Sequence, residues 1–225
     1  MILVNYTRLN RRLSAALIGS FLHRLPPHKA DALARLGDSK QATASVLGLI
    51  LLGQAAEQLN VVDFSYKKIN FSPTQKPTCS NGIEFNITHS ENIVACAVSL
   101  STALGIDSET TDERNPRLLH HVFNDNELAQ IKSGARSSLE LWVKKEAVAK
   151  ASGSGVLAMK AIVLDQERAS CNNQSWYLQR LALDVNDVSY LACQEKNPDI
   201  SLQEHSFSDC VDYYSSAHVQ DQQYG

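Results

Sequence analysis

The sequence predicts an α+β fold, and its pattern is compatible with two similar halves. Residues 40–59 and 139–152 carry the 3.6-residue apolar period of helices, and the stretches that follow them break into short runs of strand-like composition. The runs IVAC at residues 93–96 and YLAC at residues 190–193 occupy comparable late positions. Each half is therefore expected to run as a strand, a helix and further strands.

The two halves are expected to meet near residues 102–105. This division gives an N-terminal half at residues 1–102 and a C-terminal half at residues 103–225. A chain of 225 residues is long enough for each half to bury a core of its own. Because both halves belong to one chain, a site between them needs no second subunit, and we expect a monomer.

The charge balance argues against a polyanionic partner. The chain has 44% hydrophobic and 20% charged residues, and its formal net charge is -3. Its 21 Lys and Arg are scattered, whereas a nucleic-acid-binding protein usually gathers them on one face. Nucleic acid is therefore not an expected partner, and any basic pocket must be small and local.

The cysteines and the apolar runs indicate a cytoplasmic protein. The cysteines are odd in number, widely spaced and without a Cys-x-x-Cys pair, which fits a reducing compartment. The most apolar run, residues 46–52, is far shorter than the roughly 20 residues that cross a bilayer. No membrane partner is expected.

The N-terminal half is predicted to begin with a strand at residues 1–6 and a helix at residues 10–25 that two prolines end. Asp38 or Ser39 can cap the long helix at residues 40–59. Short strands are then expected, in the order of the chain, at residues 61–67, 83–87 and 93–100.

A polar cluster lies where two of these strands meet. Thr88, His89 and Ser90 bring a hydroxyl, an imidazole and free backbone amides to one turn. Such a group can hold a phosphate. Alternatively, the two hydroxyls cap the turn and His89 has no role of its own.

Two carboxylates follow the junction between the halves. In an extended chain Asp107 and Glu109 point to one face, while Ile106 and Ser108 point to the other. Two acids that share a small space resist joint ionisation unless a cation lies between them, and Mg²⁺ suits paired oxygen ligands. The alternative is a polar strand end with two solvated acids.

The C-terminal half is predicted to contain several capped helices. Asn115 caps a helix that ends near residue 122, and Asn124 with Glu127 has the spacing of a capping box. This spacing favours a structural role for Glu127, although a supporting role near a metal stays open. Strands are expected at residues 161–164, 175–183 and 188–193, before a polar tail.

The helix at residues 139–152 carries an acid and a base on an apolar stripe. A capping box opens the helix, and Gly153 closes it. Glu146 and Lys150 lie one turn apart on the stripe that also holds Trp142. They form either an exposed ion pair or a pair that lines a site, and the apolar neighbours favour the site.

Three segments together resemble the signature motifs of the 4'-phosphopantetheinyl transferases. They are FNITHS at residues 85–90, GIDSE at residues 105–109 and WVKKEAVAK at residues 142–150. Lys76 and the proline after it resemble the family's further Gly-Lys-Pro element. The chain length resembles the longer, surfactin-synthetase-activating type, and the resemblance covers nearly the whole chain.

The resemblance implies that the phosphopantetheine arm of coenzyme A is transferred to a serine of an acyl or peptidyl carrier protein, with release of adenosine 3',5'-bisphosphate. It also implies two similar α+β halves with the active site in the cleft between them. Asp107, Glu109 and Glu146 would hold Mg²⁺ on the pyrophosphate of coenzyme A.

The resemblance assigns further roles to residues of the same motifs. Glu146 would also accept the proton of the carrier serine, directly or through water, as general base. Lys150 would steady the pyrophosphate and the departing bisphosphate as a point charge. Thr88, His89 and Lys76 would contact phosphates of coenzyme A.

The sequence departs from the family pattern in three places. Ser108 stands where an aliphatic residue is usual, and Thr88 stands where Ser is common. The family also places an Arg near the start of the long first-half helix to bind the 3'-phosphate, and residues 42–48 contain none. Losing such a contact costs about 1.5–3 kcal/mol of binding, unless a substitute among Lys29, Arg35 and Lys40 takes its place.

Two alternatives compete with a transferase. One is a non-catalytic relative that binds coenzyme A or a carrier protein, as the missing Arg would allow. The other is a structural domain in which every acid is solvated or capping. The sequence does not indicate which carrier protein is used, and it indicates the docking surface only as residues 110–116 and the helix after them.

Overall fold

The computed structural model describes residues 1–72, 75–110 and 116–223. Helices and sheets occur together in this part of the chain, so the predicted α+β class is confirmed. Within it, the strands form two larger sheets and one two-stranded ribbon. The cap predicted at Asn115 lies outside the described residues.

The first sheet has the strand order β11-β1-β5-β4. Its strands are β1 (Ile2–Arg8), β4 (Glu84–His89), β5 (Ile93–Ser99) and β11 (Ile200–His205). The helices beside it are α1 (Ala15–Leu22), α2 (Pro27–Ala34), α3 (Lys40–Gln58) and α7 (Phe207–Gln223). A short helix, Tyr66–Lys68, and a ribbon of β2 (Ile69–Asn70) and β3 (Thr78–Cys79) connect α3 to β4.

The second sheet has the strand order β6-β10-β9-β8-β7. Its strands are β6 (Leu104–Glu109), β7 (Val163–Asp165), β8 (Arg168–Cys171), β9 (Gln174–Leu181) and β10 (Val188–Cys193). The helices of this half are α4 (Pro116–Val122), α5 (Asp125–Lys132), α6 (Ser138–Ser152) and a short helix at Val156–Ala161.

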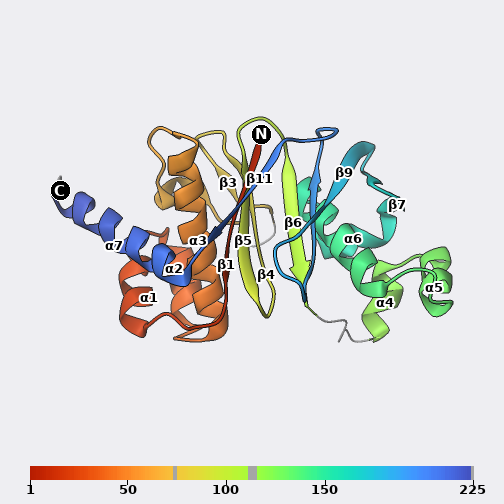
Figure 1. Ribbon diagram of the computed structural model, residues 1–225, viewed down its shortest axis with the longest axis horizontal. Coiled ribbons are helices and arrows are strands. Elements are labelled where there is room, and N and C mark those ends of the chain that lie inside the picture. Colours follow the sequence, from red (N-terminus) through yellow and green to blue (C-terminus); the bar gives the residue numbers. More distant parts are fainter. Residues whose placement is uncertain (73–74, 111–115, 224–225) are drawn as a thin grey trace.

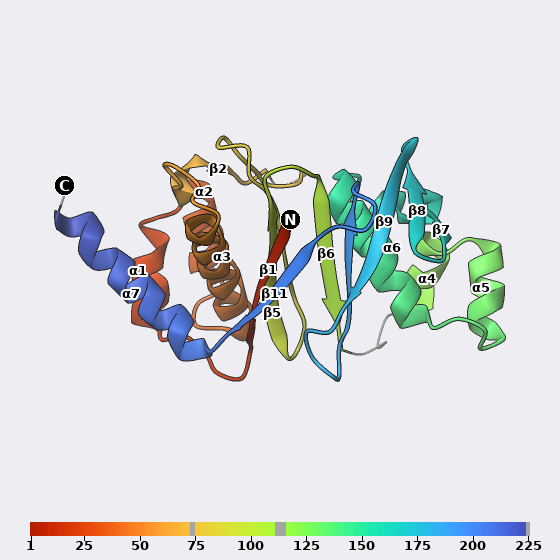
Figure 2. The ribbon, with the colours of Figure 1, turned by 45° about the horizontal axis from the view of Figure 1, so that its top comes forward.

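The two larger sheets pack face to face between helices. Figures 1 and 2 show α3 on the outer side of the first sheet and α6 on the outer side of the second. The inner layer joins apolar residues of both sheets, such as Val4 and Ile93 on one side and Ile106 and Leu191 on the other. This continuous apolar layer fixes the position of β6 relative to β4.

The polar tail returns to the first sheet. β11 pairs in parallel with β1, α7 packs on α3, and Cys210 and Tyr214 of α7 are buried in the core of this half. In the fold, residues 200–223 therefore lie with the N-terminal half. The functional division predicted at residue 102 stays a prediction.

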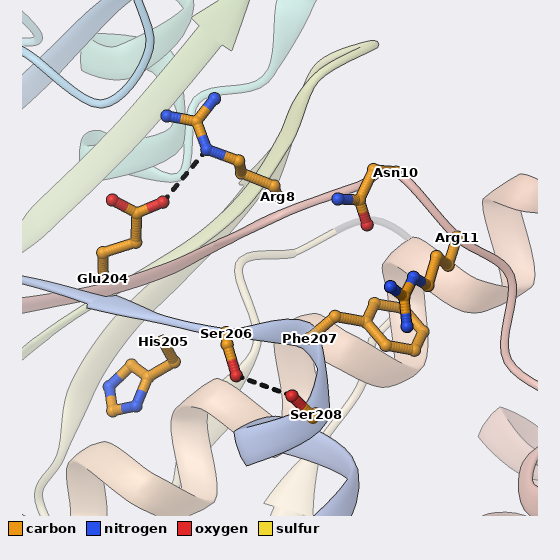
Figure 3. A pocket seen from close by; sticks show the side chains of 8 residues that line it. All are labelled: Arg8, Asn10, Arg11, Glu204, His205, Ser206, Phe207 and Ser208. Carbon is orange, nitrogen blue, oxygen red and sulfur yellow. Dashed lines mark hydrogen bonds and ion pairs between the residues drawn. The ribbon is translucent and has the colours of Figure 1, made fainter.

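A cavity of about 240 Å³ lies where β1 and β11 end and α7 begins (Figure 3). Arg8 on its rim donates from Nε to Glu204 at 3.1 Å and from Nη1 to Asp184 at 2.6 Å. The side chains that line it are those of Arg8, Asn10, Arg11, Glu204, His205, Ser206, Phe207 and Ser208.

Most capping predictions are confirmed. Ser39 caps α3, and Asn124 with Glu127 forms the full capping box of α5. Ser137 accepts from the backbone N–H of Glu140, and Gly153 ends α6 at a φ of 68°. These signals are local, so they can be identified from sequence without tertiary information.

Two local predictions are wrong. No strand forms at residues 61–67, because Asn60 and Asp63 adopt φ values of 52° and 55° and turn the chain after α3. The helix predicted at residues 10–25 begins only at Ala15, after the cap Ser14. Pro27 opens α2 as its first residue, where its missing N–H is not needed.

Candidate active site

The close approach of α6 to β6 creates the candidate site. A Cβ built at Gly105 would overlap the backbone oxygen of Ala147 and the backbone nitrogen of Ala151, and it would lie 2.9 Å from the Cα of Ala151. Only glycine leaves room for the helix backbone here. As a result, the outward-facing side chains of β6 and one face of α6 share a small volume.

Asp107 and Glu109 of β6 and Glu146 of α6 form what we call the acid cluster. Each residue offers one carboxylate oxygen, and these oxygens lie within 4.8 Å of one another. The predicted common face of Asp107 and Glu109 is confirmed, because Ile106 points into the layer between the sheets. Three carboxylates this close repel one another unless cations offset their charge.

Asp107 has one paired and one unpaired carboxylate oxygen. Its Oδ1 accepts from Nζ of Lys150 at 2.7 Å and from Oγ1 of Thr88 at 3.3 Å. Its Oδ2 is buried and has no hydrogen-bond partner among the described residues. A buried carboxylate oxygen without a donor, on a residue that shares a cluster with two further carboxylates, suits a hard divalent cation, which prefers oxygen ligands.

The environment shifts the pKa values of two groups in the cluster. Burial, and next the charge of Asp107, raise the pKa of Glu146 above that of a free carboxyl. Burial alone would lower the pKa of Lys150, but the charges of Asp107 and Glu146 outweigh it and raise that pKa. Lys150 therefore stays protonated, and Glu146 has an increased affinity for a proton.

The predicted phosphate-binding turn lies beside the acid cluster. β4 is held against β6 by a hydrogen bond from the backbone N of Ile106 to Oδ1 of Asn86, at 2.9 Å. Thr88 is buried and touches Asp107, whereas His89 is exposed. Desolvation, followed by the nearby charge of Lys150, lowers the pKa of His89, so its imidazole is mostly neutral at pH 7.

Lys76 is paired away from the cluster. Its Nζ donates to Oε2 of Glu84 at 2.7 Å, and its side chain is 14% exposed. Its Cβ lies near Gly153, at the C-terminal end of α6. Among the described residues, no hydrogen bond or ion pair joins Lys76 to Asp107 or Glu146.

The segment in which the resemblance leads us to expect an arginine, residues 42–48, lies in α3 and is buried except at the half-buried Ser45. Ala42 and Thr43 are fully buried, and Thr43 Oγ1 accepts from the backbone N of Leu13 at 3.1 Å. Of the substitutes considered, Lys40 binds Oε2 of Glu91 at 2.6 Å, and Lys29 lies 5.1 Å from the centre of the Phe71 ring. At Ser108, where the resemblance leads us to expect an aliphatic residue, the buried hydroxyl has a hydrogen-bond partner. It lies 2.7 Å from the hydroxyl of Ser189.

Lys145 was not anticipated from the sequence. Its side chain is fully buried, and its Nζ lies 2.7 Å from Oε2 of Glu127. The same Nζ donates to the carbonyl oxygens of Val122 and Met159, at 3.1 and 3.0 Å. Glu127 thus caps α5 and neutralises a lysine buried under α6. Two adjacent lysines, such as Lys144 and Lys145, usually indicate a surface exposed to solvent. In the sequence, only the 3.6-residue period of the helix indicates that one of them points inward.

The variant Glu127→Gln is expected to lower the free energy of unfolding by about 3–5 kcal/mol, because it leaves the Lys145 ammonium buried without its counterion. Urea denaturation measures the loss. As a matched control, Glu140→Gln removes an ion pair with Lys144, 2.6 Å long and 39% exposed at Glu140, and we expect a loss of about 1 kcal/mol or less. Equal losses for both variants would contradict a special role of the buried pair.

Among the described residues, no helix has the length and apolar character required to cross a membrane.

Comparisons with known proteins agree with the geometry. Residues 103–193, which contain the acid cluster, match a family model described as the 4'-phosphopantetheinyl transferase superfamily. The chain is 33% identical to 4'-phosphopantetheinyl transferase gsp of Aneurinibacillus migulanus over 57% of its own length and 56% of that protein's length. It is 27% identical to 4'-phosphopantetheinyl transferase HetI of a Nostoc species, over 67% of its own length and 68% of HetI.

The aligned region thus spans little more than half of the first of these relatives. Both relatives carry the same name, and the family model matches the segment that supplies β6 and α6. By these matches residues 103–193 are similar to the 4'-phosphopantetheinyl transferase superfamily.

Proposed function

We propose that this protein transfers the 4'-phosphopantetheine arm of coenzyme A to a serine of an acyl or peptidyl carrier protein and releases adenosine 3',5'-bisphosphate. The observation that carries the proposal is the acid cluster itself. Asp107, Glu109 and Glu146 converge from two elements, and a buried oxygen of Asp107 lacks a donor among the described residues. The family match supports the same reaction.

The acid cluster is proposed to hold Mg²⁺ through one oxygen from each carboxylate. The fit rests on the unpaired Oδ2 of Asp107 and on the negative charge of the cluster, which Lys150 offsets only in part. When bound, the ion would neutralise charge on the pyrophosphate of coenzyme A. Aspartate and glutamate oxygens also match the ligands that magnesium prefers over softer donors.

Glu146 is proposed as the group that accepts the proton of the carrier serine. Its pKa, raised by burial and by the charge of Asp107, makes it a better base than a solvated carboxylate. Lys150 lies 3.5 Å from Glu146 and 2.7 Å from Asp107, so its charge is fixed at the centre of the site. This ammonium can stabilise the charge that develops on the departing phosphate.

Thr88 and His89 are proposed to contact coenzyme A phosphates, together with Lys76. The Thr88 hydroxyl already lies within reach of Asp107, and His89 is exposed at the adjoining end of β4. Lys76 would have to leave Glu84 to take part. A role for Lys40 at the 3'-phosphate would require it to give up its pair with Glu91.

The test is a transfer assay. The full chain is incubated with coenzyme A, Mg²⁺ and an apo carrier protein, and mass spectrometry follows the gain of the phosphopantetheine arm. A gain is expected with at least one acyl or peptidyl carrier. No gain with several carriers, under conditions in which a known transferase modifies them, would overturn the proposal. Binding of coenzyme A without transfer would instead support a non-catalytic relative.

Removal of divalent ions is expected to stop the transfer. With EDTA in excess, the mass gain should vanish, because the carboxylates would repel the pyrophosphate that they are proposed to hold through the ion. Added Mg²⁺ should restore the rate. Full activity in EDTA, after removal of carried-over metal from every component, would contradict the proposed role of the acid cluster.

A further inference from the structure

A second buried aspartate joins the two halves of the chain near the acid cluster. Asp187 lies in the segment between β9 and β10 and is 7% exposed. Its Oδ2 accepts from the hydroxyl of Ser90 in a short hydrogen bond. Its Oδ1 accepts from Nδ2 of Asn92 at 2.9 Å and from Oγ1 of Thr110 at 2.8 Å. One carboxylate thus binds donors from two segments that are far from it in sequence.

These donors adjoin the residues proposed to act on substrate. Ser90 directly follows Thr88 and His89 at the turn between β4 and β5, and Thr110 directly follows Glu109 at the end of β6. Asp187 therefore links the proposed phosphate-contacting turn to the end of the strand that carries two acids of the cluster. The link runs outside the cluster itself.

The hydrogen bonds within the turn direct the hydroxyl proton of Ser90 to one acceptor. Its Oγ accepts from the backbone N–H groups of Asn92 and Ile93, at 3.0 and 3.1 Å, so its own proton is directed to Asp187. The Thr110 hydroxyl likewise accepts from the backbone N of Glu91 at 3.3 Å while it donates to Asp187. Hydrogen bonds to a buried carboxylate are stronger than neutral ones, so removing the carboxylate weakens the link between the two segments, which keep the longer hydrogen bond from Glu91 N to Thr110.

We propose that Asp187 is a positioning residue that fixes the turn directly after Thr88 and His89, the last residues of β4, relative to Glu109, and thereby sets the distance between the coenzyme A phosphate contacts and the acid cluster. Asp187 does not touch the reacting atoms. This inference rests on the proposed function for its catalytic consequence. Its structural part, a fixed separation of two segments, can be tested without turnover.

Asp184, in the same segment, provides a matched control. Its side chain is 4% exposed, and it too binds a first-half residue, because Arg8 donates to its Oδ2 at 2.6 Å. The backbone N of Asn186 donates to its Oδ1 at 2.9 Å. Arg8 ends β1 beside the cavity in Figure 3, and the side chains of Arg8 and Asp184 make no hydrogen bond to Ser90 or Thr110 among the described residues. Asp184→Ala therefore removes a comparable link that does not hold the turn.

Three variants, Asp187→Ala, Asp187→Asn and Asp184→Ala, are compared with the wild type. We expect Asp187→Ala to lower kcat about 10- to 100-fold, because a displacement of about 1 Å suffices for such a loss. The affinity for Mn²⁺, measured by electron paramagnetic resonance, should fall about 10-fold as Glu109 loses its fixed position. Asp187→Asn keeps one accepting oxygen and should recover part of both losses. Asp184→Ala should change neither quantity by more than about twofold.

Thermal unfolding of all variants shows whether a loss of kcat or of Mn²⁺ affinity is explained by reduced stability of the fold alone. If Asp187→Ala and Asp184→Ala lose activity and Mn²⁺ affinity equally, or Asp187→Ala loses neither, the positioning role is wrong. If the wild type modifies no carrier protein, the proposed function fails, and the crystal structure of Asp187→Ala decides the inference. A larger separation of Ser90 from Thr110 supports it, and an unchanged separation overturns it.

Discussion

The variant Glu146→Gln is expected to abolish transfer while the fold stays intact. The amide is close in shape to the carboxylate, but it cannot accept the proton of the carrier serine, and it removes one of the three charges of the acid cluster. General base catalysis contributes about 10²–10⁴-fold to a rate, so kcat should fall by at least that range. The mass gain of an apo carrier, followed over time, measures the loss.

Stability should change little in this variant. Lys150 keeps its shorter ion pair with Asp107, at 2.7 Å, and loses only the contact of 3.5 Å with Glu146. Neutralising a buried acid beside Asp107 also removes a repulsion that contributes to the raised pKa of Glu146. Circular dichroism and thermal unfolding provide the check. Glu140→Gln, on the same helix but paired with Lys144, is the control and should keep near-wild-type turnover. Unchanged turnover in Glu146→Gln would remove this residue from the role of base.

The pH dependence of stability has a definite sign at Lys150. Its folded pKa is raised above the unfolded value, so its contribution to stability is complete below the unfolded pKa and is lost as the pH rises through the folded pKa. The pH range in which this contribution to stability is lost is alkaline. Near neutral pH, Lys150 therefore stays charged and keeps its pair with Asp107.

The sequence predicts the local features of the site well. Alternation along a strand places Asp107 and Glu109 on one face, and helical phase places Glu146 and Lys150 on one stripe. Both patterns depend only on backbone geometry. Ser39 and Gly153 likewise mark helix ends through hydrogen bonds to their own neighbours.

Other features depend on contacts between distant segments, which one sequence does not reveal. β11 and α7 come from a tail that is polar on one side, and only pairing with β1 and packing on α3 give them an apolar environment. The burial of Lys145 requires Glu127 and two carbonyl oxygens from other elements. The role proposed for Asp187 likewise depends on donors 77 to 97 positions away in sequence.

Replacing Gly105 with alanine is expected to damage both the fold and the site. The added Cβ would overlap backbone atoms of Ala147 and Ala151, which cannot rotate away as a side chain could. The helix would have to move off β6, and overpacking of this kind costs about 3 kcal/mol of stability. Because α6 carries Glu146 and Lys150 while β6 carries Asp107, the same movement separates the groups of the site.

We therefore expect Gly105→Ala to lose at least about 100-fold in kcat in whatever fraction of the protein still folds. Urea denaturation gives the stability, and the assay is run at a temperature at which the variant is folded. Gly19→Ala is the matched control, because a Cβ at that helical position meets no atom within 4 Å and alanine stabilises a helix interior by about 0.5–1 kcal/mol. If Gly105→Ala keeps wild-type stability and turnover, the site does not depend on the close approach of α6 to β6. The surrounding core must then hold the distances within the acid cluster instead.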